Sequence, residues 1–191
     1  MKATRILKSK NLNKGKYQQL EEQAERLGKI RSEVWHSYGS ISGVSIKSDR
    51  AIRDQWLKEK RRFNVSANAW IDPLRDSFGD IKANRESAID QVRKVLYKQV
   101  SDEKKRVELS KKLKSDNWTS DNYLRRLMRK QWKHGRNHTH NQIVVRSDNY
   151  TTFQLGGCAW IKIPSLQKGK RIAIPLNSTT DRYFAIDFKR W

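Results

Sequence analysis

A dense group of cationic side chains between residues 125 and 136 has the residue types and spacing best suited to a specific chemistry. Its members are Arg125, Arg126, Arg129, Lys130, Lys133, His134 and Arg136. On a helix Arg125, Arg129 and Lys133 share one face, because residues four apart are neighbours. Such a row suits the phosphate backbone of a nucleic acid, although an ordinary solvated helix face has the same composition. Trp132, among them, is either a stacking surface for a base or an apolar anchor of the helix.

Three histidines follow the same group and raise the question of a metal site. His134, His138 and His140 have the spacing i, i+4 and i+6, which could bring three imidazoles together. Neither a cysteine nor a nearby carboxylate completes the set, since Asp148 is distant. We therefore expect no metal and no other cofactor, and interpret the histidines as part of a basic loop that contacts RNA or caps the helix. A small His-dependent nuclease remains the enzyme alternative.

Other catalytic signatures are missing from the sequence. There is no P-loop, nucleophile elbow, dinucleotide-binding turn or Cys-x-x-Cys pair. The single cysteine, Cys158, has no flanking base, and it cannot form a disulfide within the chain. Asp187 is the one carboxylate within an expected apolar strand, and a strand-end role explains it better than a catalytic one. The sequence predicts a protein that is not an enzyme.

The overall charge favours a polyanionic partner. Forty-two Lys and Arg residues against twenty Asp and Glu leave the 191 residues with a net charge of +22. A field of this size attracts nucleic acids, whose phosphates dominate such binding. Seven Trp and six Tyr add flat surfaces on which bases can stack. We expect nucleic-acid binding, while a basic character that serves only solubility would explain the charge alone.

The hydrophobic periodicity predicts a helical middle section. Apolar residues at gaps of three and four predict helices over 17–35, 84–100 and 120–133, and a second helix is capped by Ser48 and Asp49. A further helical run covers 66–81, with Pro73 tolerated near its start. Ser101 to Glu103 start another helix, so that residues 84–114 form either a helical hairpin or one long interrupted rod.

Short strands are expected at both ends of the chain. They cover residues 4–8, 142–146, 151–155, 159–163, 171–176 and 183–188, with a turn at Gly156 and Gly157. The predicted class is α+β, with residues 1–10 as the first strand, 11–140 as a basic helical lobe and 141–191 as a small antiparallel β barrel or sheet that the first strand completes. No apolar run approaches a membrane span and no signal peptide begins the chain, so we expect a soluble, cytoplasmic protein without a membrane partner.

The order of elements resembles the N-terminal half of TnpB-type transposon-encoded proteins and their relatives, the type V CRISPR effectors. The similar stretches begin at Ala3 and Gln18 near the N-terminus, and later at Asn149 and Ala159. The resemblance implies a recognition lobe and a wedge domain that grip a guide RNA and the guide–target duplex. The RuvC carboxylates and zinc element of that family lie downstream of the barrel, so we expect a part that binds RNA and does not cut it.

These observations predict a protein that binds structured RNA or an RNA–DNA duplex. The expected contact residues are Lys29, Arg31, Arg53, Lys60, Arg61, Arg62, Arg125, Arg126, Arg129, Lys130, Trp132, Lys133, Arg136, Lys162, Lys170 and Arg171. The alternatives are a DNA-binding transposase subunit or accessory repressor of a mobile element, and a structural partner of a separate nuclease-bearing chain.

Overall fold

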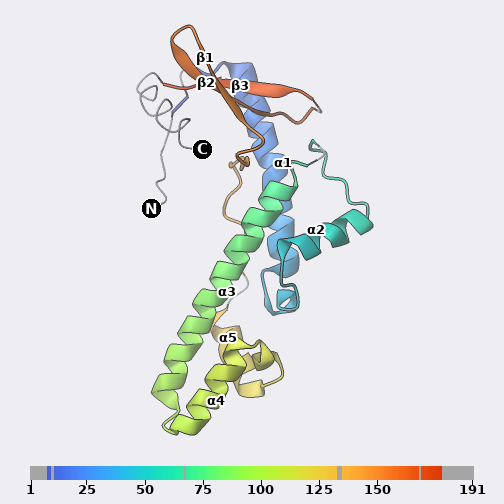
Figure 1. Cartoon of the computed structure of the whole chain (residues 1–191). Helices are drawn as coiled ribbons and strands as arrows, with labels where there is room; N and C mark the ends of the chain where they lie inside the picture. The colour runs from blue at the N-terminus through green and yellow to red at the C-terminus, as the bar shows by residue number, and fades with distance from the viewer. Residues whose placement is uncertain (1–7, 10, 67, 133–134, 168, 178–191) are drawn as a thin grey trace. The chain divides into compact units, whose positions relative to one another are not determined.

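A computed structural model of the chain describes residues 8–9, 11–66, 68–132, 135–167 and 169–177. Within these ranges five α-helices precede a three-stranded antiparallel sheet, which confirms the α+β class (Figure 1). The elements are α1 (Lys14–Tyr38), α2 (Asp49–Lys58), α3 (Ile71–Gln99), α4 (Glu103–Lys114), α5 (Asn122–Gln131), β1 (Thr151–Leu155), β2 (Cys158–Pro164) and β3 (Arg171–Pro175), with single turns of 3-10 helix at Ile41–Gly43 and Asn117–Thr119.

The first two helices form as their sequence patterns predict. α1 buries Leu27, Ile30 and Val34 along one stripe and extends a few residues beyond the expected range at both ends. α2 begins directly after Ser48, whose side chain accepts a hydrogen bond from the Ala51 amide at 3.2 Å. This cap satisfies one of the amides that a helix start leaves without an intrahelical partner.

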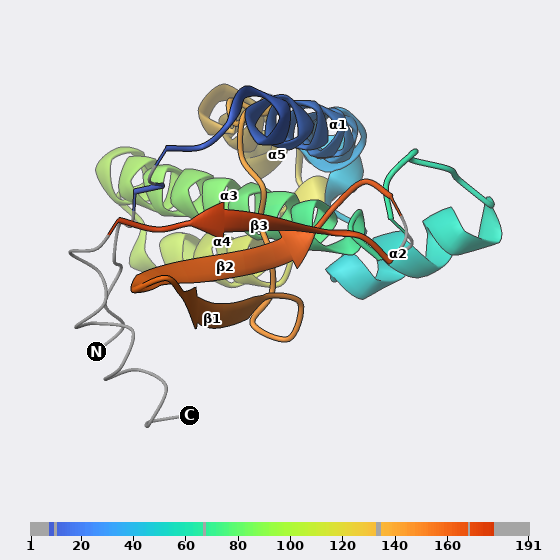
Figure 2. The same cartoon turned by 90° about the horizontal axis from the view of Figure 1, so that it is seen from above.

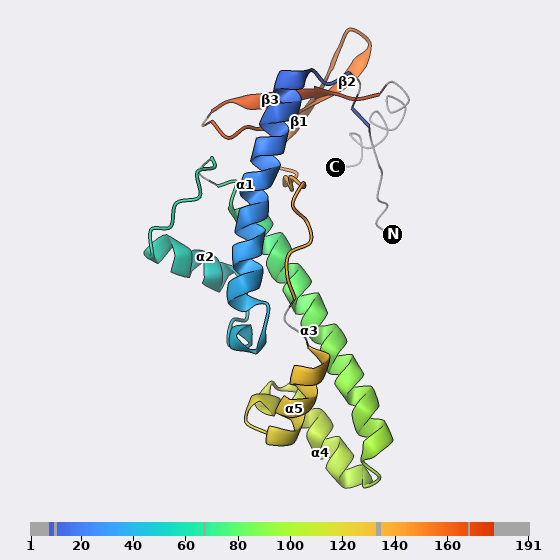
Figure 3. The ribbon, with the colours of Figure 1, turned by 180° about the vertical axis from the view of Figure 1, so that it is seen from behind.

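The third helix is longer than expected. The two helical runs predicted over 66–81 and 84–100 form one continuous helix, α3, which begins at Ile71. Pro73 is its third residue, where the missing amide hydrogen has no intrahelical acceptor in any case. α4 starts after Asp102, whose carboxylate accepts from the Lys104 amide at 2.9 Å, and turns back beside the end of α3 (Figure 3). Of the two possibilities for residues 84–114, the hairpin is confirmed.

The described residues pack into two compact units. One consists of the described residues up to Leu27, together with Phe63–Asp72 and the residues from His140 onward. The other consists of Gly28–Arg62 and Pro73–Thr139. We call them the sheet unit and the helical unit. The boundary between Thr139 and His140 lies next to the expected one at residue 140, whereas the first half of α1 and Phe63–Asp72 pack with the sheet and not with the helices.

The helical unit has an apolar core that fixes the position of α5. The core is formed by Val44, Ala88, Ile89, Val92, Leu96, Leu109, Leu113, Trp118, Leu124, Met128 and Trp132. Trp118 and Trp132 meet edge to face, with ring centroids 6.4 Å apart. Burial of this much apolar surface anchors α3, α4 and α5 to one another.

The sheet unit contains a simple meander in the order β1-β2-β3 (Figure 2). Gly156 and Gly157 connect β1 and β2 with φ angles of 58° and 73°, as a two-residue hairpin turn requires. The predicted strands over 151–155, 159–163 and 171–176 are therefore confirmed, with small shifts at their ends.

The remaining strand predictions have different outcomes. Ser9 forms an antiparallel bridge with Leu176, and the Asn177 amide donates to the Lys8 carbonyl at 2.9 Å, whereas residues 4–7 and 183–188 lie outside the described ranges. The strand predicted over 142–146 is wrong, since this segment has no ladder partner. Its β-branched residues line a pocket instead of joining the sheet.

Candidate nucleic-acid interface

The start of α5 is fixed by a side-chain cap. The Asp121 carboxylate accepts hydrogen bonds from the backbone amides of Tyr123 and Leu124, each at 3.1 Å. Leu124 and Met128, one turn apart, are completely buried in the core of the helical unit. The buried stripe leaves the opposite side of α5 in solvent.

Four cations dominate that exposed side, which also contains Asn122 and Tyr123. Arg125, Arg126, Arg129 and Lys130 are all exposed, and at about 100° per residue they spread over about 140° of the helix circumference. We call these four residues the α5 basic face. Within the described ranges none of the four forms an ion pair with a carboxylate, and α5 itself contains no Asp or Glu.

Helices α1, α3 and α4 distribute their charges differently. On α1 Arg26 pairs with Glu22, and on α4 Lys112 pairs with Glu108 at 2.8 Å. On α3 Arg93 lies 2.6 Å from Asp90. Pairs of opposite charge three or four residues apart stabilise a helix, and pairs of like charge destabilise it by about 0.2–0.5 kcal/mol. α5 contains three like-charged pairs at this spacing, Arg125–Arg129, Arg126–Arg129 and Arg126–Lys130, so its surface lowers the stability of the isolated protein.

Two of the expected contact residues are buried. Arg31 is 2% exposed, and its Nε lies 3.5 Å from the Asp76 carboxylate. Burial lowers the pKa of Arg31, and the charge of Asp76 partly raises it again. Trp132 is 4% exposed and belongs to the apolar core. Because neither side chain is open to a ligand in this structure, we remove both from the candidate interface.

Several expected residues around the end of α2 are exposed and have partners of their own. Arg61 pairs with Glu33 and with Glu59, and its guanidinium lies 4.9 Å from the centre of the Trp56 ring. Arg53, in the middle of α2 and half-buried, pairs with Asp54 at 2.7 Å. These residues are less available to phosphates than the α5 basic face is. Lys29, Lys60 and Arg62 are also exposed.

The remaining basic candidates lie in the sheet unit or after α5. Lys162, Lys170 and Arg171 are exposed, and Arg171 donates to the Thr151 hydroxyl at 3.2 Å. Arg136 is exposed in the helical unit. Lys133 lies outside the described residues, so its predicted position on the same helix face as Arg125 and Arg129 stays a prediction.

The histidine trio is only partly visible. His138 and His140 are exposed, and His134 lies outside the described ranges. Among the residues that the structure describes, no group of three or more His, Cys, Asp or Glu side chains is placed to hold a metal ion. The proposed nuclease site of three imidazoles stays untested, as does any role of Asp187, which is also outside these ranges.

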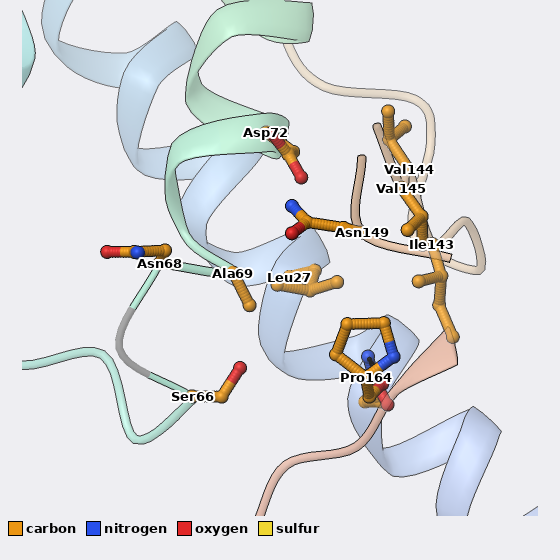
Figure 4. Close-up of a pocket in the computed structure, with 11 residues that line it drawn as sticks. Leu27, Ser66, Asn68, Ala69, Asp72, Ile143, Val144, Val145, Asn149 and Pro164 are labelled. Carbon is orange, nitrogen blue, oxygen red and sulfur yellow. Dashed lines mark hydrogen bonds between the residues drawn. The ribbon is translucent and has the colours of Figure 1, made fainter. Parts of the chain in front are cut away.

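A small pocket of about 70 Å³ in the sheet unit contains none of the expected contact residues. Leu27, Pro164 and residues 143–145 form its apolar wall, while Asp72 and Asn149 point toward one another across it (Figure 4). The Asp72 carboxylate is buried and lies 2.8 Å from Nε of Arg146.

The sequence reasoning missed an aromatic pair on the sheet. Phe153 and Trp160 are cross-strand partners, and their rings stack with centroids 6.0 Å apart. A signal for this pair was present, because a two-residue turn at Gly156 and Gly157 places positions 153 and 160 opposite each other.

Neither a membrane-spanning helix nor a relative of known family was found for this chain within the described residues and the comparisons below. In the described ranges no helix combines the length and the apolar character that crossing a membrane demands. Comparisons of the chain with protein-family models, with curated proteins and with solved structures found no match.

Proposed function

We propose that this chain binds structured RNA, and that the α5 basic face contacts the phosphates of that RNA. The observation that supports the proposal is the arrangement of Arg125, Arg126, Arg129 and Lys130 on one exposed side of a short helix without a carboxylate. Like charges so close together repel, and a polyanion removes this repulsion while it gains four charge-assisted contacts.

The geometry of the helix suits a phosphate chain. Arg125 and Arg129 are one turn apart, as are Arg126 and Lys130, so two parallel rows run along the helix at a rise of about 6 Å per four residues. Guanidinium groups bind phosphate with two parallel hydrogen bonds. Contacts of this kind recognise the path of the backbone and not its sequence.

The resemblance to TnpB-type proteins favours RNA over duplex DNA as the ligand. On that basis we propose a guide-like RNA or a guide–target duplex in the cytoplasm, and no cutting activity of this segment itself. A-form helices are recognised through shape, phosphates and 2′-hydroxyl groups, which agrees with a cationic face that has no base-reading pattern.

The test is to identify the nucleic acid that this protein retains in cells. The chain is purified at moderate salt, and the bound nucleic acid is sequenced for the wild type and for the Arg125→Gln/Arg129→Gln variant. The matched control is Lys94→Gln/Lys98→Gln, which removes two exposed cations from α3. We expect one structured RNA species in the wild type and the control, and much less of it in the α5 variant.

Two results would contradict the proposal. A random mixture of RNA and DNA that high salt removes equally from all three proteins would indicate a non-specific basic surface. Retention of one duplex DNA sequence would indicate a DNA-binding transposase subunit or repressor instead.

A further inference from the structure

The two faces of the sheet differ in burial and in chemistry. Side chains alternate between the faces along each strand, so the register places Ala159, Ile163 and Ile172 on one face, and all three are buried. The other face contains Phe153, Trp160 and Lys162, and none of its side chains is fully buried. The buried face therefore provides the packing of the unit, and the second face is left partly open.

The open face combines an aromatic pair with cations. The Phe153 and Trp160 rings are stacked with an interplanar angle of 23°. Lys162 places its ammonium 4.4 Å from the centre of the Phe153 ring, and Lys16 of α1 places its ammonium 5.2 Å from the centre of the Trp160 ring. Arg171 lies on the same face at the start of β3.

No carboxylate balances these cations in the neighbouring sequence. Residues 149–180 contain Lys162, Lys168, Lys170 and Arg171 and neither Asp nor Glu. A stretch of 32 residues without a carboxylate is notable in a chain with twenty of them. The charge of the strands and their connections is therefore complementary to a polyanion.

We propose that this face, made of Phe153, Trp160, Lys162 and Arg171, stacks unpaired bases of a bound RNA; we call it the aromatic platform. The proposal rests on the proposed function, since it takes RNA as the ligand, and it adds that part of this RNA is single-stranded. Paired bases cannot offer their faces to a protein ring, whereas bases in loops and at ends can.

The lysines over the rings are consistent with this role. An ammonium over an aromatic ring at an exposed site is held more weakly than a stacked base. A base can therefore take the place of the ammonium over Phe153, and Lys162 then becomes free to bind the phosphate of the same nucleotide. The platform thus binds one nucleotide through two neighbouring side chains: Phe153 stacks on its base and Lys162 binds its phosphate.

The experiment compares three RNA probes by fluorescence anisotropy. They are a single-stranded RNA of about ten nucleotides, the same strand with abasic nucleotides, and the blunt duplex of the same sequence. The abasic strand keeps every phosphate and offers no base to stack. The variants are Phe153→Leu and Trp160→Leu, which keep an apolar side chain in the cross-strand pair and lose the π face. The control is Gln154→Ala, which lies on the opposite face of β1.

We expect each ring variant to bind the normal single strand at least about fivefold more weakly and to bind the abasic strand and the duplex as the wild type does. A photoreactive uridine in the normal strand should crosslink to Phe153 or Trp160 in the tryptic peptide of residues 147–162. The proposal is overturned if the folded ring variants bind the normal strand unchanged, or if the wild type binds the abasic strand equally tightly. Loss of thermal stability without loss of affinity would likewise show that the pair serves only the sheet.

Failure of the platform and failure of the proposed function give different results. If the wild type binds these RNAs through the α5 basic face and the ring variants behave as the wild type, only the platform is wrong. If the wild type binds none of the probes, both are wrong.

Discussion

Arg31 of α1 and Asp76 of α3 form an ion pair in which only the carboxylate is open to solvent. Nε of Arg31 lies 3.5 Å from Oδ2 of Asp76, and the two side chains are 2% and 39% exposed. Removing water from a guanidinium is costly, and the nearby carboxylate offsets part of that cost. Arg31 is therefore a structural residue of the helical unit.

This pair predicts an asymmetry between two substitutions. Asp76→Ala removes a paired carboxylate from a buried cation and should lower the free energy of unfolding by about 1–3 kcal/mol, below the full effect of a wholly buried pair because Asp76 is partly exposed. Arg31→Met removes the charge, keeps most of the volume and should stay within about 1 kcal/mol of the wild type. Urea denaturation measures both.

The matched control for this pair is Asp54→Ala, which removes the exposed partner of Arg53 and should change stability by less than about 0.5 kcal/mol. Arg31→Met should also leave RNA affinity unchanged. If Arg31→Met lost more stability than Asp76→Ala, the prediction would be wrong. The interactions of the guanidinium would then stabilise the fold by more than its desolvation destabilises it.

A pH dependence follows from Asp80, one turn after Asp76 on α3. Burial raises the pKa of Asp80, the Asp76 carboxylate raises it further, and Arg31 lowers it. The folded protein therefore binds this proton more tightly than the unfolded chain does. The free energy of unfolding therefore decreases as the pH rises from about 4, the ordinary pKa of an aspartate, to the raised pKa of Asp80 in the folded protein. Above the raised pKa it decreases no further on account of this group.

Asp80→Asn should consequently raise the melting temperature at pH 7, and this gain should disappear as the pH falls below the ordinary aspartate range. Thermal melts of both proteins across this range measure the effect. The comparison variant is Asp90→Asn, which breaks the pair with Arg93 and should bring no gain. A gain that grows toward low pH would contradict the assignment.

The N-terminal cap of α5 gives a third prediction. Asp121→Ala removes the acceptor of two backbone amides and should cost about 1 kcal/mol of stability. Asp121→Asn keeps an acceptor oxygen at the same position and should cost much less. Chemical denaturation followed by circular dichroism checks both, and equal losses in the two variants would mean that the charge and not the cap is important.

The sequence predicted elements whose signals are local. Ser48 and Asp102 mark helix starts through caps within three residues, and the glycine pair at 156 and 157 determines a hairpin and hence its register. The apolar stripe of α5 also allowed its exposed cations to be foreseen. Each of these signals acts over one turn of chain, where propensity and capping dominate.

Predictions that depended on tertiary contacts were less successful. Arg31 has the same local signal as an exposed cation, and its burial depends on tertiary packing within the helical unit. The β-branched run at 143–145 has the composition of a strand, but strand formation requires an open edge with which to pair. The aromatic platform was missed because stacking of Phe153 on Trp160 becomes evident only once the register is known.

The central claim is that the four cations of the α5 basic face bind RNA phosphates. Its most direct test is the salt dependence of RNA affinity for the wild type and for the variant with Arg125, Arg129, Arg126 and Lys130 all changed to Gln. The control changes Lys94, Lys98, Lys104 and Lys111 to Gln and so removes the same charge from α3 and α4.

If about six phosphates are neutralised, the logarithm of the wild-type affinity should fall against the logarithm of salt concentration with a slope of about −5. The account predicts a slope of about −2 for the α5 variant, because about four phosphate contacts are lost. The control should keep a slope close to that of the wild type. An α5 variant that is folded and has the same slope as the control would contradict the account.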